Sequence, residues 1–275
     1  MSLIFRNIRL IAIDADDTLW ETQPFFDKIE EWYCSFLSKY ANQEFIGSEF
    51  FKRECYNMEK LGYGSKAFII SLVENAISVT NGNVKPSELM EIIEKGRSLI
   101  DIPATPLEGV EETLKLLREK IMENNLNVVN IGSSKERENE NIRERKKKGD
   151  SVKSEICDKK VKMIIFTKGD SKEQEVKIFR SGLLKYFDDY RVYSEKREED
   201  YFKLIREFGV EPENFIMIGN SFKSDIEPVL KIGGRAIHIP FYAPWKYELT
   251  DEYDHPHLIK ILHFNKLNDF IFEIS

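Results

Sequence analysis

The chain has 275 residues and a net charge of -7, with 41% hydrophobic, 12% aromatic and 32% charged residues. This length predicts one large domain, or one core that carries a smaller insert, and the composition is typical of a globular protein. The negative charge gives no support to nucleic-acid binding, which needs a basic face.

Cysteine usage and apolar runs indicate the compartment. Cys34, Cys55 and Cys157 are an odd number without metal-ligand spacing, which predicts free thiols in a reducing environment. The N-terminal apolar run is too short for a signal peptide, and no stretch of 18 or so apolar residues occurs. We therefore expect a cytoplasmic protein with neither membrane nor nucleic-acid partners.

The strand signals are short apolar runs that end in polar residues. Residues 10–13 end in carboxylates, and two later runs have the same form, 163–166 and 215–218. Helical patterns alternate with them at residues 109–120, 171–180 and 200–208. This alternation predicts an α/β fold, a Rossmann-like parallel sheet with helices on both faces, which binds ligands at the carboxyl ends of its strands.

Two segments interrupt this pattern. Residues 25–100 show helical periodicity, so we predict an α-helical module over 21–104 that is inserted into a core from 1–20 and 105–275. Residues 123–160 form an insertion whose later half is highly charged and almost free of aromatics, which predicts disorder or a solvated helical loop on the core surface; the alternative is a specific docking element. A protein partner of this insertion is not identified by its sequence.

The strongest chemical signal is DADDT at residues 14–18. Asp14 and Asp16 follow a buried strand, where the chain bends and both carboxylates can face one site as nucleophile and general acid. The alternative is an acidic turn that only caps the strand.

At this point the sequence resembles the haloacid dehalogenase-like hydrolase superfamily, whose first motif is an apolar strand followed by DxDx(T/V). The later motifs of that superfamily occur here in order, as MIIFTKGD, SEKREEDYFKLI and FIMIGNSFKSDI. The resemblance covers residues 5–20 and 105–240 apart from the charged insertion, and many members carry a helical cap in the position of the helical stretch.

The resemblance implies a phosphatase mechanism. Asp14 would attack phosphorus to give an aspartyl-phosphate, and Asp16 would protonate the leaving oxygen and then activate water. Thr167, Lys168 and Lys196 would bind the phosphoryl group of a small phosphorylated substrate.

The resemblance also implies a Mg²⁺ cofactor held by Asp14, Asp16, Asn220 and Asp225, with Asp16 contributing its backbone carbonyl. Asn220 departs from the commonest form of the fourth motif, which has an Asp at that position. An amide oxygen can ligate Mg²⁺ but brings no charge.

Substrate selection is expected from the cap, with Trp20, Glu21, Tyr63 and Lys66 as candidates near the nucleophile loop and in the glycine-flanked turn. A dehalogenase is disfavoured because that branch lacks the aspartate that Asp16 supplies. A phosphomutase on the same core, and a catalytically weak binding or scaffold protein, stay open as alternatives.

Overall fold

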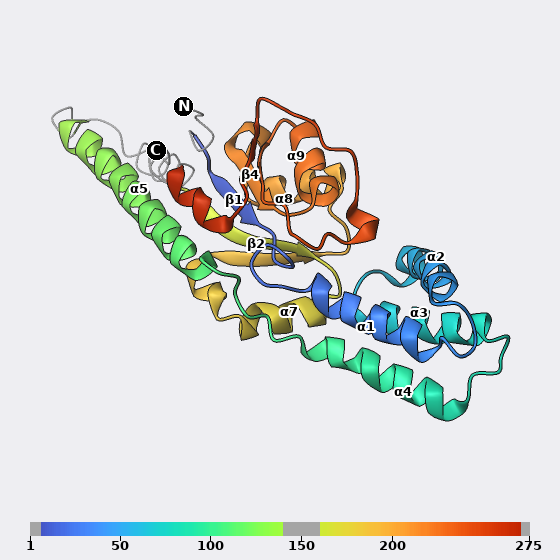
Figure 1. The fold of residues 1–275 in the computed structure, drawn as a ribbon. Helices are drawn as coiled ribbons and strands as arrows, with labels where there is room; N and C mark the ends of the chain where they lie inside the picture. The colour runs from blue at the N-terminus through green and yellow to red at the C-terminus, as the bar shows by residue number, and fades with distance from the viewer. Residues whose placement is uncertain (1–6, 140–159, 271–275) are drawn as a thin grey trace.

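The computed structural model describes residues 7–139 and 160–270 (Figure 1). Its core is a six-stranded sheet in the order β3-β2-β1-β4-β5-β6, in which every neighbouring pair is parallel. The strands are β1 (Leu10–Ile13), β2 (Lys162–Lys168), β3 (Asp189–Tyr193), β4 (Phe215–Gly219), β5 (Arg235–His238) and β6 (Leu258–Lys260). This architecture confirms the predicted Rossmann-like α/β class.

The central strand explains why the sheet is covered on both faces. All residues of β1 are buried, and β1 pairs with both β2 and β4. Because side chains alternate along a strand, Ile11 and Ile13 pack in one hydrophobic cluster while Leu10 and Ala12 pack in another. Helices α5 and α7 contribute to the first cluster, and α8 and α9 contribute to the second.

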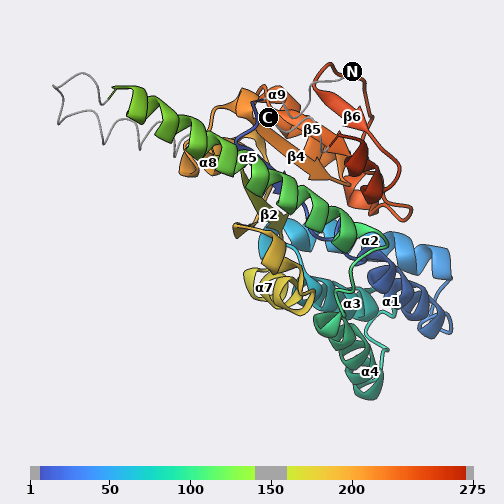
Figure 2. The same ribbon diagram turned by 90° about the vertical axis from the view of Figure 1, so that its left-hand side faces the viewer.

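The helices follow the strands in the alternation that the sequence predicts (Figure 2). Their bounds are α1 (Gln23–Phe36), α2 (Gln43–Leu61), α3 (Ser65–Val79), α4 (Pro86–Arg97), α5 (Val110–Asn139), α7 (Ser171–Arg180), α8 (Glu198–Glu207) and α9 (Glu227–Lys231). Short 3₁₀ or π turns complete the fold at η1 (Ser98–Asp101), η2 (Leu183–Tyr186), η3 (Pro212–Asn214), η4 (Phe222–Ile226), η5 (Lys246–Glu248) and η6 (Phe264–Asp269). Within the described ranges, no helix combines the length and apolar character needed to cross a membrane.

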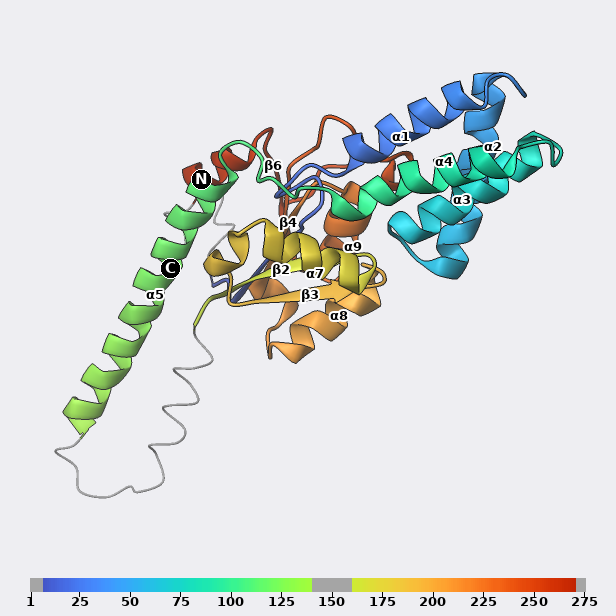
Figure 3. The same ribbon diagram turned by 90° about the horizontal axis from the view of Figure 1, so that it is seen from below.

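Helices α1 to α4 occupy the stretch predicted as the cap. They form a group beside the sheet (Figure 3) and bury their own cluster, centred on Tyr33, Phe50, Phe68 and Leu72. The Tyr33 hydroxyl lies 2.7 Å from Asn75 Oδ1 and 2.9 Å from the Leu72 carbonyl oxygen, so α1 and α3 are also joined by hydrogen bonds.

Helix α5 corrects the prediction of disorder from about residue 123. The helix continues to Asn139, because Glu, Lys and Arg have high intrinsic helix propensity. Asn125 also ties it to β2: its side chain donates to the Val161 carbonyl at 3.0 Å and accepts from the Val161 amide at 2.8 Å. The rest of the predicted insertion, 140–159, lies outside the described residues.

We expect Asn125→Ala to lower the free energy of unfolding by about 1–3 kcal/mol, because the polar backbone of the buried Val161 loses both partners. Asn124→Ala makes the same change in helix propensity next to it and serves as the control. Urea denaturation of both variants measures the difference. Equal urea midpoints for the two variants would show that the two hydrogen bonds between Asn125 and Val161 do not contribute to stability.

Candidate active site

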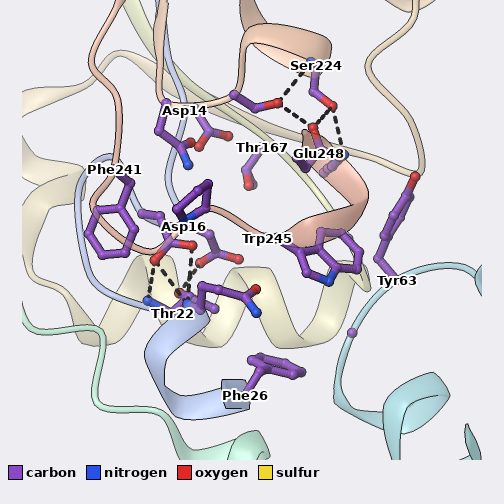
Figure 4. A pocket seen from close by; sticks show the side chains of 18 of the residues that line it. Asp14, Asp16, Thr22, Phe26, Tyr63, Thr167, Ser224, Phe241, Trp245 and Glu248 are labelled. Carbon is purple, nitrogen blue, oxygen red and sulfur yellow. Dashed lines mark hydrogen bonds and ion pairs between the residues drawn. The ribbon is translucent and has the colours of Figure 1, made fainter. Parts of the chain in front are cut away.

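A cavity of about 270 Å³ lies between the carboxyl ends of β1, β2 and β4 and the helices α1 to α3 (Figure 4). Asp14, Asp16, Thr167 and Lys196 line it, as do residues of α1, α2 and α3. Parallel strands bring their carboxyl ends to one edge of the sheet, so motifs far apart in the sequence meet here.

Lys196 joins the first and fourth motifs. Its ammonium contacts Asp14 Oδ1 directly and lies 2.8 Å from Asp225 Oδ1. Burial opposes the charge of Lys196, but the two carboxylates raise the pKa of its ammonium above the ordinary value. Burial also raises the pKa of Asp14, to about 7, although Lys196 opposes this rise. One ammonium shared by two carboxylates leaves an excess of negative charge in a buried site.

The backbone of the fourth motif places Asp225. A π-turn spans Phe222–Ile226, a distortion that often marks functional sites, and the Ser221 amide donates to Asp225 Oδ2 at 3.0 Å. A Cβ on Gly219 would lie 2.3 Å from that oxygen, so only glycine fits there. Asp225 is thus engaged by Lys196 and a backbone amide.

Asp16 is held by a second lysine. The Lys177 ammonium lies 2.6 Å from both carboxylate oxygens, and the Gln174 amide donates to Oδ2 at 2.7 Å. On the other side, Thr22 Oγ1 and Trp20 Nε1 donate to Oδ1, each at 2.8 Å. Burial favours the neutral acid, but Lys177 and the hydrogen bonds from Gln174 and Thr22 outweigh it and hold the pKa of Asp16 below its usual range.

Oxygen ligands for a cation converge beside Asp14. Thr18 Oγ1 lies 3.2 Å from Asp14 Oδ2 and 3.1 Å from Asn220 Oδ1, so the Thr18 hydroxyl joins these two oxygens. Within residues 7–139 and 160–270, no three His, Cys, Asp or Glu side chains form a metal-binding group, because Asp16 and Asp225 are turned to lysines. The donor set therefore suits a hard cation such as Mg²⁺, with little ligand charge beyond Asp14.

Lys168 forms an ion pair with Glu248, a residue that the sequence does not single out. Its ammonium pairs with Glu248 and lies 2.8 Å from Ser224 Oγ. Glu248 also accepts hydrogen bonds from Ser221 and Ser224, so η5 is fixed over the fourth motif. Thr167 and Lys168 both line the cavity, and Thr167 is buried.

Of the four residues predicted to contact the substrate, one lines the cavity and three do not. Tyr63 lines the cavity and its hydroxyl lies 3.2 Å from Glu195. Trp20 does not line it: the ring is fully buried in the core, and its indole positions Asp16. Glu21 and Lys66 also fall outside the lining, because Glu21 bonds the Tyr242 hydroxyl and Lys66 pairs with Asp170 at 2.6 Å.

Several residues of the site are not found by the sequence analysis. Gln174 and Lys177 are three residues apart on a helix that the pattern predicts, so they share one face, and that spacing was an available signal. Glu248 and Trp245 lie in a segment without strand or helix periodicity, where no signal existed. His238 is buried and its Nε2 lies 2.9 Å from the Asn220 carbonyl oxygen, a supporting contact to the fourth motif.

Comparison with known proteins gives structural matches alone. No family model matches the chain, and no curated protein matches it in sequence. A haloacid dehalogenase-like family hydrolase from Xanthomonas campestris is 26% identical, with a TM-score of 0.75, over 98% of this chain and 92% of that one.

More distant structures share the fold. The 2-haloacid dehalogenase of Pseudomonas syringae is 15% identical with a TM-score of 0.55, over 98% of this chain and all (100%) of that one. The Bacillus subtilis HAD-hydrolase YfnB, solved with bound magnesium, is 12% identical with a TM-score of 0.55, over 98% and 99% of the two chains. With its fold and its four ordered motifs, this chain belongs to the haloacid dehalogenase-like hydrolase superfamily.

We expect Lys177→Met to lower kcat for hydrolysis by about tenfold or more, because Asp16 loses the ammonium that orients it. Lys172→Met, at an exposed position of the same helix, should leave kcat unchanged. The double variant with Asp16→Ala separates positioning from a general effect on the site. If Lys177→Met lowers activity equally with and without Asp16, Lys177 does not act through Asp16.

Proposed function

We propose that the protein is a magnesium-dependent phosphatase that hydrolyses a small phosphorylated metabolite through an aspartyl-phosphate on Asp14. One observation carries this proposal: Asp14 and Asp16 line one cavity, and each is held by its own buried lysine, Lys196 or Lys177. Nucleophilic attack and proton transfer are thereby assigned to different carboxylates.

The charges around Asp14 suit attack on phosphorus. The Asp14 carboxylate that is shared with Lys196 attacks the phosphoryl group, and the Lys196 ammonium offsets part of the negative charge that gathers there. Thr167, at the end of β2, offers its hydroxyl to a phosphoryl oxygen. Lys168 contributes positive charge to the same edge, although Glu248 shares it.

Asp16 serves in both steps. Its lowered pKa keeps it ionised in the free site, which suits the base that activates water in the second step. In the first step a bound phosphate brings negative charge near Asp16 and raises its pKa, which favours the proton that the leaving oxygen needs. Asp16 also favours a phosphatase over a dehalogenase, which needs no acid for a halide leaving group.

Magnesium would be held by Asp14, Asn220 and the backbone carbonyl of Asp16, with Asp225 acting through Lys196. When bound, it would supply positive charge against the phosphoryl oxygens and the excess charge around Lys196. The magnesium in the similar Bacillus subtilis structure supports this choice of cation.

We expect Asp14→Asn to abolish turnover with the fold intact, because an amide cannot attack phosphorus. Asp16→Ala should lose about 10²–10⁴-fold for an alkyl phosphate, and less for an aryl phosphate whose leaving group needs no proton. Phosphate release from both ester types, with circular dichroism as the fold control, measures these effects. Activity of Asp14→Asn within a few-fold of wild type would refute the nucleophile assignment.

We expect Asn220→Asp to lower the magnesium concentration that gives half-maximal activity, because a charged oxygen replaces a neutral one beside Asp14. Asn124→Asp adds the same charge on α5, away from the cavity, and should leave that concentration unchanged. Magnesium titrations of both variants, with a chelator arm, provide the measurement. Superimposable curves for Asn220→Asp and wild type would remove Asn220 from the metal site.

A further inference from the structure

A buried carboxylate lies in the cap part of the cavity. Glu54 of α2 lines the cavity and is only 8% exposed. Across residues 7–139 and 160–270, no hydrogen bond or ion pair reaches its carboxylate. Asn57 on the same helix, by contrast, donates to Ser71 Oγ at 3.0 Å and to Glu74 Oε2 at 2.8 Å. The Glu54 carboxyl group therefore opens into the cavity with no protein partner, where a ligand can reach it.

The surroundings of Glu54 favour a positively charged partner. Phe26, Met58 and Phe68 line the same cavity, and the Phe26 ring lies within the pocket that also holds Asp16 (Figure 4). Burial, together with the charges of Glu30 and Asp27 on α1, raises the pKa of Glu54 to about 8, while Lys246 opposes it. Lys246 itself lies 3.6 Å from Glu30, which shares its charge.

We propose that Glu54 binds a protonated amino group of the substrate, which is then a phosphomonoester with an apolar body and an ammonium at the end opposite its phosphate. A nearby ammonium favours the ionised form of Glu54, which releases its proton to solvent and accepts a charge-assisted hydrogen bond. Aromatic faces such as that of Phe26 also stabilise a cation. The apolar lining accepts the body that joins the two ends. The inference rests on the proposed phosphatase function for the position of the phosphate.

Two esters of equal shape test the proposal. Para-(aminomethyl)phenyl phosphate and para-(hydroxymethyl)phenyl phosphate differ only in the group that would meet Glu54. The wild-type protein should show a KM about tenfold or more lower for the amine, the scale of a charge-assisted hydrogen bond. Equal KM values, or a preference for the alcohol, would overturn the proposal.

Glu54→Gln keeps the shape of the side chain and removes its charge, so the preference for the amine should fall to about twofold or less. Glu59→Gln makes the same change at an exposed position of α2 and should keep the wild-type preference. Thermal unfolding should show Glu54→Gln to be at least as stable as wild type, because the Glu54 side chain has no protein partner to lose. Retention of the full preference in Glu54→Gln would overturn the proposal.

A second measurement does not depend on catalysis. Calorimetric titration with benzylammonium should show binding to the wild-type chain and at least about tenfold weaker binding to Glu54→Gln. If no phosphate ester is hydrolysed, the proposed phosphatase function fails, and this titration alone decides on the amine site. Absence of binding, or equal binding by both proteins, would overturn the site whatever the outcome for catalysis.

Discussion

The contact of the Lys196 ammonium with Asp14 and Asp225 is the interaction on which the rest of the site depends. Asp14 follows β1, Lys196 precedes α8 and Asp225 lies in the turn after β4, so this one contact fixes three segments that are distant in sequence. A buried charge group of this kind is stable only if it is nearly balanced, and removing one partner typically costs about 3–5 kcal/mol. Here one ammonium faces two carboxylates, so the group carries one excess negative charge when both are ionised. A bound cation would neutralise this charge, whereas a phosphate bound without a cation would add to it.

Lys177 holds Asp16 separately from Asp14, which contacts Lys196. Lys177 and Gln174 hold Asp16 from α7, while Trp20 and Thr22 hold it from the start of the cap connection. Asp16 is therefore held both by the segment that leads into α1 and by α7. Glu248 adds a comparable tie between η5 and Lys168, so the segment that carries Trp245 is fixed at the cavity wall.

The sequence predicts the strands that carry the motifs, because a continuous apolar run ending in polar residues has few other solutions in a parallel sheet. It does not predict β3, whose residues are all half-buried, the four-residue β5 or the three-residue β6. Asp14, Thr167 and Lys196 could be found from motif order, whereas Glu54 and Glu248 could not, since their roles arise from tertiary contacts alone. Trp20 shows that a position close to Asp14 in sequence does not predict a substrate contact, because its side chain is buried in the core.

The central claim is that Asp14 carries the phosphoryl group during turnover, and an acid-quenched reaction tests it most directly. The protein is mixed with an aryl phosphate and magnesium, stopped in acid within the first turnover, digested and analysed by mass spectrometry. The account predicts a phosphoryl adduct on the peptide that contains Asp14, and its absence from the Asp14→Asn variant treated in the same way. Rapid release of phosphate with the adduct on another residue, or with Asp14 unmodified at every quench time, would contradict the account.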